Sequence, residues 1–409
     1  MLISLDRARD HLVREGLDAV IATTPINVAY AGDFASEFLL GRFDDDTAAV
    51  ILPADSAVPP ALVIAEFDLP YLTAQPSWIE EVQLYGNPWS SVGVFMGETL
   101  ERELTTPLRR RLADLRARWR PGQQDDYDSA VAQALANRGL TAGRLACDDP
   151  RKAVRLAARG VGGSRGIADA HQLLRRIRMV KSDAELAIMT RGAEINAGAL
   201  SRVIANGAAG MAEDAVIREY RRYLTEHDAR WLGERGMMFG AGDASSFSLP
   251  ASGDRRLQPG DAVVLDCLGT FQGYHMDLAR TAVVDGPTAE QELRYRAVRT
   301  ALEAVEDAIR PGIHTQDLRR LTRDTVAGFG LRGDLVSVTT HGIGLEVFEF
   351  PEADSLVRGF PLEEGMVVNT EVFYRDPELG SFHLEDSVVV MAGGCRFLSP
   401  MPRDLVVFR

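Results

Sequence analysis

Cysteine, long apolar runs and excess positive charge are all scarce in this sequence. Its three cysteines, Cys147, Cys267 and Cys395, are odd in number and far apart, which argues against a disulfide framework and favours a reducing compartment. No apolar segment approaches membrane-spanning length, and the first residues lack the basic and apolar pattern of a signal peptide. The net charge of -14 argues against general nucleic-acid binding, because such a surface would not neutralise phosphates. We therefore expect a cytoplasmic protein with no membrane or nucleic-acid partner.

Two or three domains are expected from the 409 residues, of which 46% are hydrophobic and 25% charged. Helix and strand patterns alternate in the first part, which predicts an α/β domain over residues 1–165. A Gly-rich segment at 161–166 is the linker candidate. Residues 166–409 then begin with the capping-box spacing of Ser182 and Glu185, followed by long amphipathic helices and long strands. That order predicts an α+β second domain.

Five side chains of metal-ligand type lie in apolar strand-like runs or beside Gly turns of the second domain. Carboxylates in such runs are costly unless a cation or a base accompanies them. Four carboxylates and one imidazole suit one or two divalent ions such as Mn, Fe, Co or Zn. Cys267 adjoins this set, but strand alternation predicts that its thiol points away. The candidate ligands are Asp266, Asp277, His341, Glu371 and Glu385.

The order and spacing of the five residues carry a family resemblance. The motifs are LQPGDAVVLD (257–266), GYHMDLART (273–281), HGIG (341–344), EGMVVNTE (364–371) and LED (384–386). With these motifs the chain resembles the M24 metallopeptidase family, which includes aminopeptidase P, prolidase, methionine aminopeptidase and creatinase. The resemblance implies an α/β creatinase-like N-terminal domain, 1–165, followed by an α+β pita-bread catalytic domain, 166–409. It also implies a homodimer.

The same resemblance implies roles for the five residues. Asp266 and Asp277 would bind one metal ion. Asp277, His341 and Glu371 would share or hold the other, and Glu385 would bridge the two. Glu371 would also act as the general base that accepts the proton of the metal-activated water.

The chain departs from the family where substrate is handled. Peptidases of the family carry three further histidines, and their places hold Leu249, Ser337 and Phe348 here. The arginine expected two residues before the last glutamate is His383. Because these losses affect the groups that stabilise the oxyanion, they predict a substrate other than the usual Xaa-Pro peptide.

Two histidines are candidates to replace the missing ones. His275 lies two residues before Asp277, and His383 lies two residues before Glu385. Residues two apart share a face of a strand, so both rings could point toward the metal pocket. Each could serve as a catalytic acid or base or as an added ligand, or it could be a hydrogen-bonded structural histidine.

The leading interpretation is a divalent-metal-dependent hydrolase that cleaves a C–N bond of a small amide or dipeptide-like substrate. A metal-dependent lyase on the same fold is the alternative, and the missing histidines are compatible with it. A non-catalytic pita-bread binding module is a third. Retention of all five ligands weighs against that module, because an idle site has no need of them.

Overall fold

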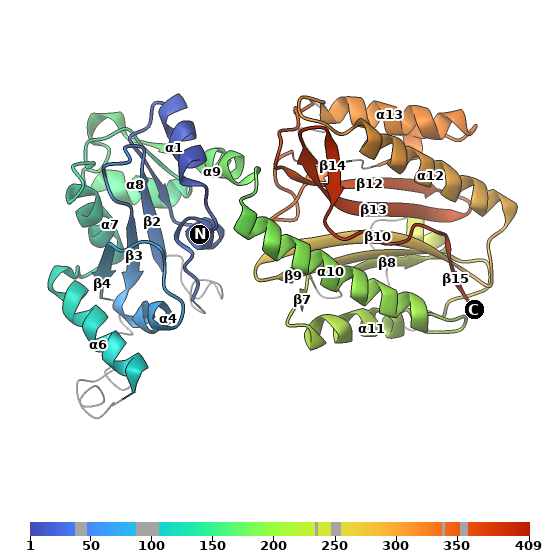
Figure 1. Cartoon of the computed structure of the whole chain (residues 1–409), viewed down its shortest axis with the longest axis horizontal. Helices are drawn as coiled ribbons and strands as arrows, with labels where there is room; N and C mark the ends of the chain where they lie inside the picture. The colour runs from blue at the N-terminus through green and yellow to red at the C-terminus, as the bar shows by residue number, and fades with distance from the viewer. Residues whose placement is uncertain (37–46, 87–105, 234–235, 247–254, 338–339, 352–358) are drawn as a thin grey trace. The chain divides into compact units, whose positions relative to one another are not determined.

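The computed structural model describes residues 1–36, 47–86, 106–233, 236–246, 255–337, 340–351 and 359–409. Leu249 lies outside these residues. The chain forms two compact units, Met1–Arg178 and Met179–Arg409, coloured from blue to green and from green to red in Figure 1. None of the described helices is long and apolar enough to span a bilayer.

The first unit is built on a six-stranded mixed sheet with helices around it (Figure 1). Antiparallel pairs join β1 to β2 and β2 to β3, and parallel pairs add the other three strands. The sheet order is β4-β3-β2-β1-β5-β6. The strands are β1 Ala19–Ala22, β2 Ala48–Pro53, β3 Ala61–Ala65, β4 Val82–Tyr85, β5 Leu145–Cys147 and β6 Ile167–Asp169, and the helices are α1 Leu5–Arg14, α2 Pro25–Gly32, α4 Leu69–Ala74, α6 Pro107–Trp119, α7 Tyr127–Ala136, α8 Pro150–Ala158 and α9 His171–Arg178.

The division between the units falls after Arg178, later than the Gly-rich segment that suggested a boundary after residue 165. The difference consists of β6 and α9. Strand β6 pairs with β5 in parallel, with Leu145 opposite Ile167. Helix α9 contacts α1, so both elements belong to the first unit. Pairing between strands, which local composition does not reveal, therefore decides which unit holds the segment after the glycines.

The second unit contains a nine-stranded sheet whose central path is β11-β12-β13-β10-β9-β7. Its long strands pair antiparallel, which agrees with the α+β architecture predicted for this domain. The strands are β7 Arg230–Trp231, β8 Met237–Ala241, β9 Ala262–Phe271, β10 Tyr274–Val284, β11 Thr340–Gly342, β12 Val367–Asp376, β13 Gly380–Met391, β14 Gly394–Phe397 and β15 Val406–Phe408, and the helices are α10 Asp183–Asn206, α11 Glu213–Glu226, α12 Ala289–Ala308 and α13 Thr315–Gly328.

Two helix pairs cover this sheet (Figure 1). Helix α10 packs against β9 and β10 with α11 beside it, and α12 packs against β12 and β13 with α13 beside it. The predicted capping box of α10 is present, because Ser182 and Glu185 each bond to the other's backbone N–H. Thr288 and Gln291 form a second capping box on α12. These caps satisfy backbone donors that a helix start otherwise leaves unpaired.

Period-two alternation sorts the side chains of the central strands between the two faces of the sheet. On one face, alternate apolar residues pack under the helices. They include Val263, Leu265 and Cys267 of β9, Met276 and Leu278 of β10, Val372 and Tyr374 of β12, and Phe382 and Leu384 of β13. The thiol of Cys267 is therefore in the helix-side core, as predicted. The intervening residues, among them the predicted ligands, project from the opposite face.

Three buried ionic side chains, Arg280, Asp386 and Glu306, and the half-buried Arg403 are nevertheless present on the helix side. The Arg280 guanidinium donates to the Asp386 carboxylate at 2.8 Å, and both groups are almost fully buried. Arg403 bonds to the second oxygen of Asp386 and also to Glu306 of α12. Each carboxylate therefore meets a guanidinium, so the charges offset one another in a region of low dielectric.

Replacing Arg280 with Met tests this cluster. The substitution leaves the buried Asp386 with fewer donors, so the free energy of unfolding of the second unit should fall by about 3–5 kcal/mol. Arg299→Met is the matched control, because Arg299 pairs with Glu303 on an exposed helix surface, and such pairs contribute about 0–1 kcal/mol. Urea unfolding measures both. Equal losses for the two variants would contradict this account of the cluster.

Candidate metal centre

Five strands each supply one of the predicted ligands to the sheet face opposite the helices. Glu371 of β12 lies directly opposite Glu385 of β13. Ala279 of β10 is paired with Glu385 on one side and with Asp266 of β9 on the other. Asp277 is two residues from Ala279, so the two aspartates are diagonal neighbours rather than opposite each other. The strand register alone therefore gathers four carboxylates on one small area.

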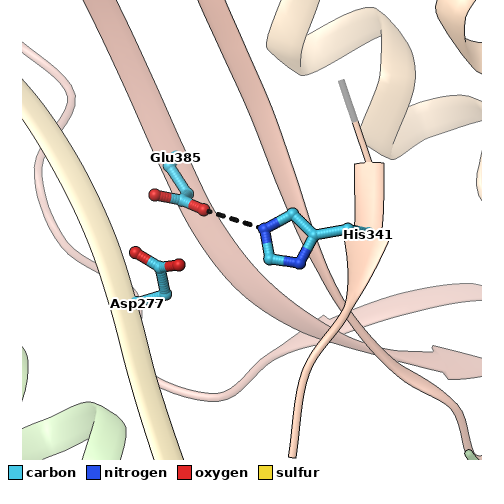
Figure 2. Close-up of side chains that lie close together, drawn as sticks. All are labelled: Asp277, His341 and Glu385. Atoms are coloured by element: carbon cyan, nitrogen blue, oxygen red, sulfur yellow. Dashed lines mark ion pairs between the residues drawn. The ribbon is translucent and has the colours of Figure 1, made fainter. Parts of the chain in front are cut away.

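A first group of ligand atoms comes from Asp277, His341 and Glu385. Figure 2 shows the three side chains converging from β10, β11 and β13 on one space. Their ligand atoms all lie within 4.8 Å of one another. His341 Nε2 is 3.7 Å from a Glu385 oxygen and 3.4 Å from Glu371 Oε1. Glu371 thus adjoins this group as well.

A second group comprises Glu371, His383 and Glu385, whose ligand atoms also lie within 4.8 Å of one another. His383 Nε2 is 3.0 Å from Glu371 Oε2, and its Nδ1 is 3.8 Å from Asp266 Oδ2. The His383 ring stacks on Phe373 with a centroid separation of 4.4 Å and an interplanar angle of 6°. The structure therefore brings His383 among the predicted ligands.

Burial of these polar groups fits a cation. All five predicted ligands and His383 are buried. Within the described part of the chain, Oδ1 of Asp266, Oδ1 of Asp277 and Nδ1 of His383 are buried without a hydrogen-bond partner. Buried carboxylates in such numbers are costly unless a positive charge accompanies them. Carboxylate and imidazole donors at this spacing suit divalent ions of the Mn, Fe, Co or Zn type.

The two aspartates hold protons more tightly than free aspartates do. Burial raises the pKa of Asp266 to about 7, although the charge of His383 opposes the rise. Burial also raises the pKa of Asp277 well above its ordinary value, and the charge of Glu385 adds to the rise. Without a cation, the cluster relieves its mutual repulsion by binding protons.

The pKa of His341, the histidine of the first group, is raised even though burial alone would lower it. Its contact with Glu385 and the charge of Glu371 outweigh burial. The same carboxylates that would attract a metal ion therefore also favour a proton on this ring. A metal ion has to displace that proton to use the nitrogen.

Two polar neighbours of the ligands were not predicted from the sequence. Asn369 Nδ2 donates to Glu385 Oε1 at 2.8 Å, and Ser387 Oγ donates to the Asn369 side-chain oxygen. Asn369 lies two residues before Glu371, so strand alternation was the signal that could have identified it. Its amide orients a candidate ligand, as groups just outside a metal's ligand set commonly do.

His275, the other candidate catalytic histidine, lies against backbone. Its ring Nδ1 is 3.2 Å from the Gly344 carbonyl oxygen, and the backbone N–H of His275 donates to the same oxygen at 2.7 Å. Burial lowers the pKa of His275. These contacts join β10 to the Gly-rich segment that follows His341.

The described residues at the missing-histidine positions also border the site. Phe348 is 51% exposed, and its ring centroid lies 4.6 Å from that of His341. Ser337 lies beside β12, where its backbone N–H donates to the Phe373 carbonyl. A large exposed aromatic ring beside a candidate ligand is available to touch a substrate.

Comparison with known proteins now decides the family. Residues 187–392 match metallopeptidase family M24, and this region contains all five candidate ligands. The chain belongs to family M24. The resemblance drawn from the motifs is thereby confirmed, together with the pita-bread fold that it implied.

Relatives of this M24 protein include an uncharacterized peptidase, YqhT, of Bacillus subtilis, which is 30% identical over 57% of this chain and 65% of its own length. The Xaa-Pro dipeptidase of Pyrococcus horikoshii is 28% identical over 57% and 66%. These matches thus span just under two thirds of each relative. A crystal structure of the prolidase from P. horikoshii superposes with a TM-score of 0.72 at 20% identity, covering 98% of this chain and 99% of that one.

Metal-free protein should lose stability as the pH rises. The folded pKa of Asp266 is raised from 3.8 to about 7, so the folded state binds more protons than the unfolded chain between those values. The stabilisation from that proton is complete below the unfolded pKa and is lost as the pH rises through about 7. The raised pKa values of Asp277 and His341 act in the same direction.

Thermal melting of chelator-treated protein across this pH range measures the effect. The midpoint should fall with pH, and Mn²⁺ added near pH 7 should restore it. The Asp266→Asn variant should show a weaker pH dependence because it lacks the titrating carboxyl. A midpoint that rises with pH in the metal-free protein would be inconsistent with protons held by the cluster.

Proposed function

We propose that this M24 protein is a divalent-metal-dependent hydrolase that cleaves a C–N bond of a small peptide-like substrate. The observation that carries the proposal is the buried convergence of Asp266, Asp277, His341, Glu371 and Glu385 on one sheet face. Membership of a metallopeptidase family supports it. The names of the relatives, which include Xaa-Pro dipeptidases, favour a substrate of dipeptide size.

The five residues would hold one or two divalent ions, with Glu385 common to both groups of ligand atoms. Bound there, such ions would polarise the scissile carbonyl and lower the pKa of a water molecule. The Asn369 amide holds one oxygen of Glu385 in place. The burial of the site keeps bulk water away from the carboxylates, which strengthens their interactions with a cation.

Glu371 would act as the general base that accepts the proton of the attacking water. Its Oε2 bonds to His383 Nε2, which leaves its Oε1 directed toward His341. The His383 ring is held by its stack on Phe373. His383 would therefore position Glu371 and take part in the proton's onward transfer. His275 would support the loop after His341 through Gly344.

The site border favours a substrate that differs from the peptides which the family's histidines handle. Phe348 places an aromatic ring where such a histidine is expected. A ring of this kind contributes apolar contact but neither donates nor accepts a proton in the reaction. The choice of substrate would then depend in part on apolar contact with Phe348.

The first test combines metal removal with a single substitution. Chelator should abolish hydrolysis of a dipeptide and small-amide panel, and Mn²⁺ or Co²⁺ should restore it. Glu371→Gln should lower kcat by about 10²–10⁴-fold because the base is lost. The control is Glu303→Gln on the exposed surface of α12, which should leave kcat unchanged. Metal-loaded protein that cleaves nothing in the panel, or a fully active Glu371→Gln variant, would refute the proposal.

His383 can be tested with a graded pair of variants. His383→Ala should lower kcat by about tenfold or more, since Glu371 loses its buried hydrogen bond. His383→Gln should recover part of this loss, because the amide nitrogen can occupy the place of Nε2. His227→Ala serves as the control, as its ring stacks on Tyr223 at the end of α11. Full kcat in His383→Ala would exclude the role assigned to this ring.

A further inference from the structure

Three residue pairs of β12 and β13 share the sheet face that carries the ligands. Alternation places Glu371, Phe373 and Arg375 of β12 on this face. Across the strands, their partners are Glu385, His383 and Ser381. The face therefore changes along the strands from carboxylates, to an aromatic–imidazole stack, to a guanidinium opposite a hydroxyl.

Arg375 is held in place by the neighbouring elements. Its Nε donates to Ser337 Oγ at 3.1 Å, and its guanidinium carbon lies 4.0 Å from the Phe373 ring centroid. Ser337 also contacts the Phe373 carbonyl through its backbone N–H. The plane of the guanidinium is thus fixed over the ring, which reduces the entropy lost when it binds a planar anion. Ser337 occupies one of the positions where a family histidine is absent.

Arg375 lies on the sheet face that carries the metal centre, four positions after Glu371 on β12. Burial lowers the pKa of Arg375, and the charge of Glu371 opposes that shift. Four carboxylates on one face would repel an anionic substrate group, so such a group needs a cation beyond the metal ligands. Arg375 supplies a positive charge on the same face, separated from Glu371 by Phe373.

An unpartnered hydroxyl lies directly across from Arg375. Ser381 is buried, and its Oγ has no hydrogen-bond partner among the described residues, although its backbone N–H donates to Ser245 Oγ. A buried hydroxyl without a partner is costly unless a ligand or water meets it. A hydroxyl and a guanidinium together are suited to the two oxygens of a carboxylate.

We propose that Arg375 binds a carboxylate of the substrate, with Ser337 and Phe373 positioning the guanidinium and Ser381 donating to the same anion. This inference rests on the proposed hydrolase function and names the class of molecule that it acts on. Glu371 and Arg375 are four positions apart on β12, about 13 Å between Cα atoms. Because the Arg375 side chain folds back over Phe373, the remaining span suits an acidic substrate of dipeptide size.

The test compares molecules that differ only in the carboxylate. The kinetic pair is Ala-Ala and Ala-ethylamide, and the binding pair is L-alanine and ethylamine, measured by calorimetry on Mn²⁺-loaded protein. The wild type should prefer the carboxylate member by about 10- to 100-fold, as expected for charge-assisted hydrogen bonds. Arg375→Gln should remove this preference, mainly through KM. Arg299→Gln, on the exposed surface of α12, should keep it.

A second variant distinguishes a weakened anion site from a folding defect. Ser337→Ala retains the cation but removes the acceptor for its Nε, so it should weaken the preference partially and leave the melting midpoint near that of the wild type. A wild type that does not distinguish the two binding probes, or that binds neither, would overturn the proposal, as would an Arg375→Gln variant that still prefers the carboxylate. If binding prefers the carboxylate while neither substrate is cleaved, the anion site stands and the hydrolase proposal fails.

Discussion

Mutual repulsion among four buried carboxylates is the constraint on which this catalytic unit depends. The strand register of β9, β10, β12 and β13 places Asp266, Asp277, Glu371 and Glu385 within one small buried area. Such a cluster is compatible with a folded protein only if protons or cations balance it. The raised pKa of Asp266 and the ring of His341 beside two glutamates are both consequences of that balance. The same carboxylate repulsion therefore affects both the stability of the fold and its affinity for a cation.

The opposite face of the same sheet provides the rigidity that this arrangement needs. Apolar residues under α10, α11 and α12 hold the strands in register, and the Arg280–Asp386 pair lies among them. Because close-packed interiors resist small displacements, the ligand atoms on the other face keep their spacing. A site built on long paired strands is also more precisely held than one built on loops.

The sequence was sufficient to predict the fold and the capping box of α10, and it named the five candidate ligands that the strands bring to one face. Those features follow from local rules, such as the Ser182–Glu185 spacing, or from motifs whose order is specific. The diagonal relation of Asp266 and Asp277 depends on hairpin register, which the residues between them did not reveal. Likewise, the sequence did not point to Arg375, because its bond to Ser337 joins residues that are 38 positions apart. Long-range pairing is the information that local patterns lack.

Glu385 and Asp386 are consecutive, yet they face opposite sides of β13 and are neutralised in different ways. Asp386 meets the guanidinium groups of Arg280 and Arg403, whereas Glu385 faces the candidate metal centre. A slip of one residue in the pairing of β13 would exchange these two environments and would also turn Leu384 and Phe382 out of the core. The consecutive residues Glu385 and Asp386 therefore favour one alignment of β13 over its one-residue neighbours. Only the correct pairing of β13 places Asp386 against Arg280 and Arg403 and also directs Glu385 toward the candidate metal centre.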